Sequence, residues 1–207
     1  MEHTSTDMTA CTKTADSLEG VRIAYALTGS YCTFAESIAT MKSLAEKGAV
    51  LIPIMSDNAY STDTRFGTAE EFVGQIEAIC SRAVIHTIKD AEPVGPTKMA
   101  DIMVVAPCTG NTLAKLAGSI TDTAVTMAVK SHIRNARPVV LCIATNDALA
   151  GTAKNLGALM NMRNYYFVPL RQDDSNAKPT SVVADFGKLE VTILAALNGK
   201  QIQPVLS

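Results

Sequence analysis

The chain has 207 residues, of which 47% are apolar and 18% are charged, a composition typical of one globular domain. Its formal net charge of -2 excludes the strongly basic surface with which proteins hold nucleic acid or an anionic membrane. No apolar run approaches the roughly 20 residues that cross a bilayer. The five cysteines include no CxxC pair, which favours a reducing, cytoplasmic setting.

Residues 1–20 are rich in small polar and charged side chains and lack a cationic segment followed by an apolar one, so they predict a flexible arm rather than a secretory signal. Beyond them, short apolar runs alternate with segments of helical periodicity. The runs predict strands at residues 21–28, 50–55, 83–87, 102–106, 139–145 and 166–169. The spacing predicts a first helix from Phe34 to just before Gly48 and a second that begins at a capping box formed by Thr68 and Glu71. A third helix is predicted after Asn111, and three more at residues 122–133, 153–162 and 182–197.

This alternation predicts a flavodoxin-like α/β fold, in which a doubly wound, mainly parallel sheet carries helices on both faces in three layers. Residues 21–207 are predicted to form a single domain, because no repeat or change in composition divides them. The polar stretch 171–181 is predicted to be a loop. In such folds ligands bind outside the carboxyl ends of the strands, so the loops there are the candidate sites.

The first strand is followed by Thr28, Gly29 and Ser30, which precede a helix. Backbone N–H groups, two hydroxyls and the positive end of a helix converge there, as in a phosphate-binding loop. The segment is neither GxGxxG nor GxxxxGK[ST], and such a turn is often only a helix cap. A second hydroxyl-rich turn follows the strand at 102–106, and the two together predict a shared ligand.

The second turn, Pro107-Cys108-Thr109-Gly110-Asn111-Thr112, resembles the P-A-S-A-N-T motif of flavin-containing cysteine decarboxylases and the related flavin prenyltransferases. That resemblance implies FMN as cofactor, with its phosphate on the first loop and its ring against the second. The residues that it places at the cofactor are Thr28, Gly29, Ser30, Ser56, Pro107, Thr109, Gly110, Asn111 and Thr112.

One position departs from the decarboxylase pattern. Those enzymes have a histidine eight residues before the Asp that opens the third strand, and here Pro93 stands eight residues before Asp101. Proline cannot transfer protons or donate from its nitrogen. Cysteine decarboxylation is therefore disfavoured.

Further segments resemble the B subunits of dipicolinate synthase, among them Asp63-Thr64-Arg65-Phe66-Gly67, Ala144-Thr145-Asn146-Asp147-Ala148 and Phe167-Val168-Pro169-Leu170-Arg171. The resemblance implies a role in making pyridine-2,6-dicarboxylate during sporulation, in the cytoplasm of the mother cell. It also implies a partner, the dehydrogenase or A subunit of dipicolinate synthase, which carries NADP. Related flavoproteins build the flavin site between subunits, which implies a homo-oligomer such as a trimer or dodecamer.

Three cations are candidates for holding a small dicarboxylate substrate. Arg65 has the planar fork that suits a carboxylate, although a loop salt bridge with Asp63 or Glu70 would explain it equally well. Arg171 and Lys178 lie in the polar stretch, where solvated charges are the commoner explanation.

No catalytic residue is identified by the sequence. Cys108 precedes a helix, which could lower its pKa, although packing beneath the cofactor is the simpler interpretation. The three histidines have no metal-ligand spacing, so no metal site is predicted. Two alternatives remain open: a non-catalytic subunit that supports the dehydrogenase, and an FMN-dependent decarboxylase or prenyltransferase with another substrate.

Overall fold

One seven-stranded sheet organises the computed structural model, which describes residues 15–206. The strand order is β2-β1-β3-β4-β7-β6, with β5 paired beside β4. The first five strands pair in parallel, whereas β7 runs antiparallel to both β4 and β6. The strands are β1 (Arg22–Leu27), β2 (Val50–Met55), β3 (Ile102–Cys108), β4 (Val139–Thr145), β5 (Tyr165–Phe167), β6 (Leu170–Asp174) and β7 (Lys178–Ala184).

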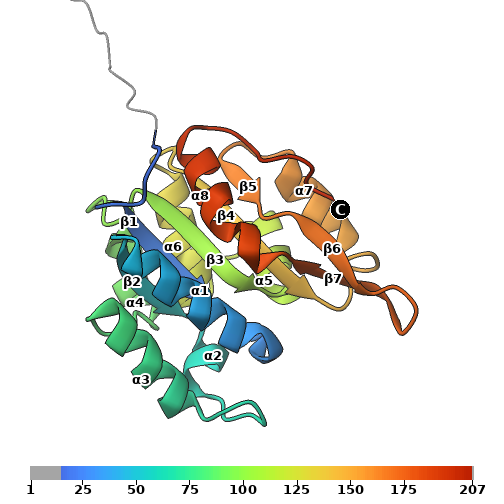
Figure 1. Cartoon of the computed structure of the whole chain (residues 1–207), viewed down its shortest axis with the longest axis horizontal. Coiled ribbons are helices and arrows are strands. Elements are labelled where there is room, and N and C mark those ends of the chain that lie inside the picture. Colours follow the sequence, from blue (N-terminus) through green and yellow to red (C-terminus); the bar gives the residue numbers. More distant parts are fainter. Residues whose placement is uncertain (1–14, 207) are drawn as a thin grey trace, which may run out of the picture.

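Helices cover both faces of this sheet, as the alternating pattern predicts. In Figure 1, α1 and α8 lie in front of the strands and α5 and α6 lie behind them. The α-helices are α1 (Phe34–Glu46), α2 (Asp57–Ser61), α3 (Ala69–Cys80), α4 (Ile88–Ala91), α5 (Gly110–Ala117), α6 (Ala124–Ile133), α7 (Ala153–Met160) and α8 (Leu189–Leu197). Short 3-10 helices occur at η1 (Tyr31–Thr33), η2 (Glu92–Val94) and η3 (Phe186–Lys188). The predicted flavodoxin-like, doubly wound fold is confirmed.

The central strands are buried along nearly their whole length. All seven residues of β3 are buried, as are the first six of β4. A strand covered on both faces has no solvent side, so its apolar residues run continuously instead of alternating. Strands β1 to β4 were predictable from sequence for this reason.

The carboxyl end of β4 leaves the parallel sheet and joins a hairpin. Val139 to Leu141 pair with β5, but Ala144 and Thr145 pair with β7. The β6–β7 hairpin therefore extends the sheet at the edge where the turns after β1 and β3 lie (Figure 1). The predicted loop at 171–181 and the first part of the predicted helix at 182–197 are wrong here. Most of β6 is exposed and polar, so it lacks the apolar pattern that reveals a strand.

Two other predictions change in detail. Residues 83–87 form no strand, since only Ile85 makes an isolated bridge, to Ile54. The predicted flexible arm is partly fixed: Leu18 is buried, and the Gly20 amide donates to the Gly48 carbonyl (2.9 Å). Residues 1–14 of that arm lie outside the described residues. Within the described part of the chain, every helix is too short or too polar to traverse a lipid bilayer.

Candidate functional site

Two neighbouring cavities open at the carboxyl edge of the sheet. The larger has a volume of about 790 Å³ and the smaller about 370 Å³. Both are lined by Gly29, Thr109 and Asn111, which come from the two turns predicted to share a ligand. Their sizes are within the range of small-molecule sites.

Thr28 joins the two turns to each other. Its buried hydroxyl donates to the Pro107 carbonyl (2.8 Å) and accepts from the Thr109 amide (3.0 Å). The Thr28 amide also donates to Pro107 (3.2 Å). Thr28 lines the smaller cavity, but its side chain fixes the spacing of the loops. Pro107 is buried and lines neither cavity.

Helices begin directly at these loops. Thr109 caps α5, because its hydroxyl accepts from the Thr112 amide (3.3 Å), and Ser56 caps α2 in the same way. The first amides of α5 give this end of the helix a positive partial charge. Asn111 is exposed, lines both cavities, and its side chain hydrogen-bonds to no other described residue. Ser30 lines the larger cavity only.

Gly110, the first residue of α5, is packed tightly against the loop after β4. A Cβ atom at Gly110 would lie 2.6 Å from Thr145 Oγ1 and 2.9 Å from both Asp147 Oδ1 and Thr152 Oγ1. Thr145 and Thr152 donate to the two oxygens of Asp147, at 2.6 and 2.8 Å. Hydrogen bonds from Thr145 and Thr152 hold the pKa of Asp147 below its ordinary value. Residues 145–147 were recognised only as part of a resemblance, and no local signal links them to Gly110.

Arg65 lines the larger cavity from the turn between α2 and α3. It forms no ion pair with any residue in the described range, so the alternative of a salt bridge with Asp63 or Glu70 is not observed. Asp63 instead accepts from the Ala69 amide (2.8 Å). The guanidinium lies over the ring of Phe66, with Cζ 4.9 Å from the ring centroid. Phe66 also lines the cavity, a position that sequence reasoning missed.

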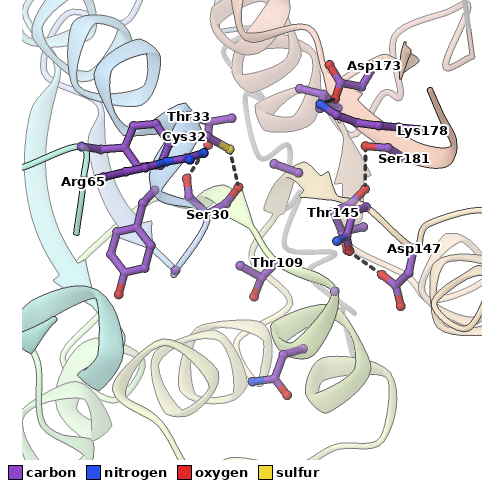
Figure 2. A pocket seen from close by; sticks show the side chains of 18 residues that line it. Ser30, Cys32, Thr33, Arg65, Thr109, Thr145, Asp147, Asp173, Lys178 and Ser181 are labelled. Atoms are coloured by element: carbon purple, nitrogen blue, oxygen red, sulfur yellow. Dashed lines mark hydrogen bonds and ion pairs between the residues drawn. The ribbon is translucent and has the colours of Figure 1, made fainter. Parts of the chain in front are cut away.

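Lys178 approaches from the opposite side of the larger cavity, as Figure 2 shows. It begins β7, and its Nζ lies 2.7 Å from a carboxylate oxygen of Asp173, which raises the lysine pKa. Arg171 is exposed on β6 and does not line either cavity. The structure thus brings Arg65 and Lys178 to one cavity but leaves Arg171 outside it.

Three further side chains, Cys108, Pro93 and His86, line neither cavity. Cys108 is fully buried, and burial raises the pKa of its thiol to about 12, so the described environment does not support a nucleophile. Pro93 is exposed in η2 and lines neither cavity. His86 stacks on Tyr60 with ring centroids 3.8 Å apart. Across residues 15–206, no three His, Cys, Asp or Glu side chains are grouped as metal ligands.

Comparison with known proteins gives consistent matches. The flavoprotein family model matches residues 12–192. The B subunit of dipicolinate synthase from Bacillus subtilis (strain 168) is 46% identical over 190 residues, covering 92% of this chain and 95% of that protein. The crystal structure of the dipicolinate synthase B subunit from Bacillus halodurans C has 41% identity and a TM-score of 0.85, covering 92% of this chain and 98% of that one. The FMN-dependent cysteine decarboxylase SpaF has 21% identity and a TM-score of 0.63 over 88% of this chain and 98% of its own, and that likeness shows the fold alone.

Proposed function

Since the chain belongs to the flavoprotein family and is a homologue of the B subunit of dipicolinate synthase, we propose that it is the FMN-binding subunit of such a synthase. Its partner in this proposal is the dehydrogenase or A subunit, which holds NADP, in the cytoplasm of a sporulating mother cell. The product is pyridine-2,6-dicarboxylate. The arrangement that carries the proposal is the pair of cavities sharing Gly29, Thr109 and Asn111.

The residues at these cavities fit a flavin nucleotide. Thr109 caps α5, whose positive end suits a phosphate, and Ser56 and Gly29 line the same smaller cavity. Asn111 has a free amide that faces both cavities and can donate to or accept from a ring heteroatom. We assign the phosphate to the smaller cavity and the ring to the larger one. A bound flavin would supply two-electron redox chemistry at this edge of the sheet.

The larger cavity also suits an anionic substrate. Arg65 and Lys178 face it from opposite sides, so each can hold one carboxylate of a dihydropyridine or tetrahydropyridine dicarboxylate. For a dihydropyridine, formation of the aromatic product removes a hydride equivalent and a proton. The role of these two side chains is to orient the ring in the cavity, one side of which is lined by the β6–β7 hairpin.

A second candidate is a non-catalytic subunit that binds and supports the dehydrogenase. The Thr28 hydroxyl already donates to Pro107 and accepts from Thr109 within the protein, which is the observation that favours this alternative. An FMN-dependent decarboxylase is less well supported, because Pro93 replaces the histidine and lies away from both cavities. In all three cases we propose a homo-oligomer, by resemblance to related flavoproteins.

Flavin binding by Asn111→Ala tests the site. We expect the wild-type chain to quench added FMN fluorescence on binding, and Asn111→Ala to bind roughly tenfold more weakly, because the proposed hydrogen bond to the flavin is lost. Asn155→Ala, on α7 and outside both cavities, is the control and should bind as the wild type does. Equal FMN affinity in wild type and Asn111→Ala would contradict the assignment of the turn at residues 107–112 to FMN binding.

A reconstitution assay separates the candidate functions. Ultraviolet spectra would record dipicolinate formed by the dehydrogenase with this chain, with and without FMN. Formation that requires both chains and FMN is expected. If the chain binds no FMN yet still raises the activity of the dehydrogenase, the supporting role is correct instead.

A further inference from the structure

We propose that Phe66 is a positioning residue, whose ring holds the Arg65 guanidinium at the larger cavity and so prepares it to bind a carboxylate. The proposal rests on the proposed function, because it concerns the substrate anion of the same site. It assigns a role to Phe66, which the sequence motifs place beside Arg65 without giving it one. In this proposal Phe66 affects ligand binding indirectly, through Arg65, and does not contact the ligand itself.

The first observation is that the turn carrying both residues is preformed. Thr64 and Gly67 exchange two backbone hydrogen bonds, at 3.0 and 3.2 Å, and the Phe66 amide donates to Thr64 Oγ1 (3.2 Å). Gly67 has a φ of 149°, a conformation that side chains rarely adopt. A Cβ there would lie 2.9 Å from the ring of Phe72 on α3. The backbone of the turn is thus fixed against the body of the protein.

The second observation is that Phe66 has little other reason to be aromatic. It is 47% exposed and lies on the rim of the larger cavity, so core packing does not explain it. Its ring contacts the Arg65 guanidinium, at 4.9 Å from the centroid to Cζ. Arginine is one of the most flexible side chains, and any ligand that it binds must immobilise it. A guanidinium already resting on a ring loses less freedom on binding.

The third observation is that Arg65 forms no ion pair with any described residue. It has no acidic partner within the described residues, whereas Lys178 across the cavity is paired with Asp173. Of the two cations, Arg65 therefore offers its charge without first breaking an ion pair. Its fork geometry suits a planar carboxylate. An acidic partner would neutralise the Arg65 charge, whereas the Phe66 ring holds the guanidinium at the cavity and leaves its charge available.

A double-mutant cycle tests the route. The affinity of the full-length, FMN-supplemented chain for pyridine-2,6-dicarboxylate is measured by calorimetry in wild type, Phe66→Leu, Arg65→Ala and the double variant. An exposed cation–π contact predicts about two- to fivefold weaker binding for Phe66→Leu. In the Arg65→Ala background, Phe66→Leu should cause no further loss, because the residue through which it acts is gone. Phe66→Tyr should restore wild-type affinity.

Two controls identify a merely structural effect. The melting temperature of Phe66→Leu should equal that of the wild type, because the side chain is half exposed. Neutral pyridine-2,6-dicarboxamide should bind Phe66→Leu and wild type equally, since it offers Arg65 no charge.

Three outcomes would overturn the proposal. If Phe66→Leu weakens binding equally with and without Arg65, the ring contacts the ligand itself. If Phe66→Leu binds as wild type, the ring contact has no role. If the wild-type chain binds FMN but not pyridine-2,6-dicarboxylate, the assignment of the larger cavity to a dicarboxylate is wrong, and this inference is lost with it. The first two results would leave the proposed function intact.

Discussion

Gly110→Ala probes the tightest contact of the candidate site. The added methyl would lie 2.6 Å from Thr145 Oγ1 and 2.9 Å from oxygens of Asp147 and Thr152, well inside van der Waals contact. Thr145 cannot rotate away freely, because its hydroxyl donates to Asp147 at 2.6 Å. The methyl must therefore break that hydrogen bond or displace the first turn of α5.

Overpacking of this kind costs about 1–3 kcal/mol. For a chain of this length that corresponds to a fall in melting temperature of roughly 2–12 °C, measured by differential scanning calorimetry. FMN affinity should fall as well, because Gly110 begins the helix whose first amides line the site. Gly74→Ala, inside α3, is the matched control: no atom lies within 4 Å of its Cβ position, so the better helix propensity of Ala should raise the melting temperature slightly. A Gly110→Ala protein that melts at or above the wild-type temperature would refute the close approach.

Two further predictions concern stability. Thr28→Val removes the hydroxyl between Pro107 and Thr109 and leaves the partly buried Thr109 amide without its acceptor. The free energy of unfolding should therefore fall by about 1–3 kcal/mol in denaturant titrations, whereas Thr28→Ser should keep most of that stability. Burial lowers the pKa of His132, whose Nε2 donates to the Pro138 carbonyl, to about 4. The unfolded chain binds a proton at His132 more readily than the folded chain does. The contribution of neutral His132 to the free energy of unfolding is therefore complete above pH 6.5 and is lost as the pH falls toward 4, by roughly 3 kcal/mol in total. The melting temperature should drop less over that range in His132→Gln, and an equal drop would exclude His132 as the cause.

The sequence alone determined the parallel core and the location of the two hydroxyl-rich turns, where a ligand site is predicted. Strands β1 to β4 are continuous apolar runs, and Thr68 with Glu71 forms the predicted capping box of α3. These signals are local, because each depends on residues a few positions apart. The hydroxyl-rich turns after β1 and β3 could likewise be located, since parallel strands bring their carboxyl ends to one edge.

Only the tertiary structure decided what surrounds those turns. Strand β6 is mostly exposed and polar, so it has no apolar pattern. It forms a hairpin with β7 because the end of β4 offers β7 a pairing edge, which is a contact between distant segments. The same long-range packing brings Thr145 against Gly110 and places Lys178 across the cavity from Arg65. Side chains that meet only after the chain has folded have no spacing to reveal them. For this reason the turns could be predicted from the sequence, whereas the contacts between distant segments around the cavity could not.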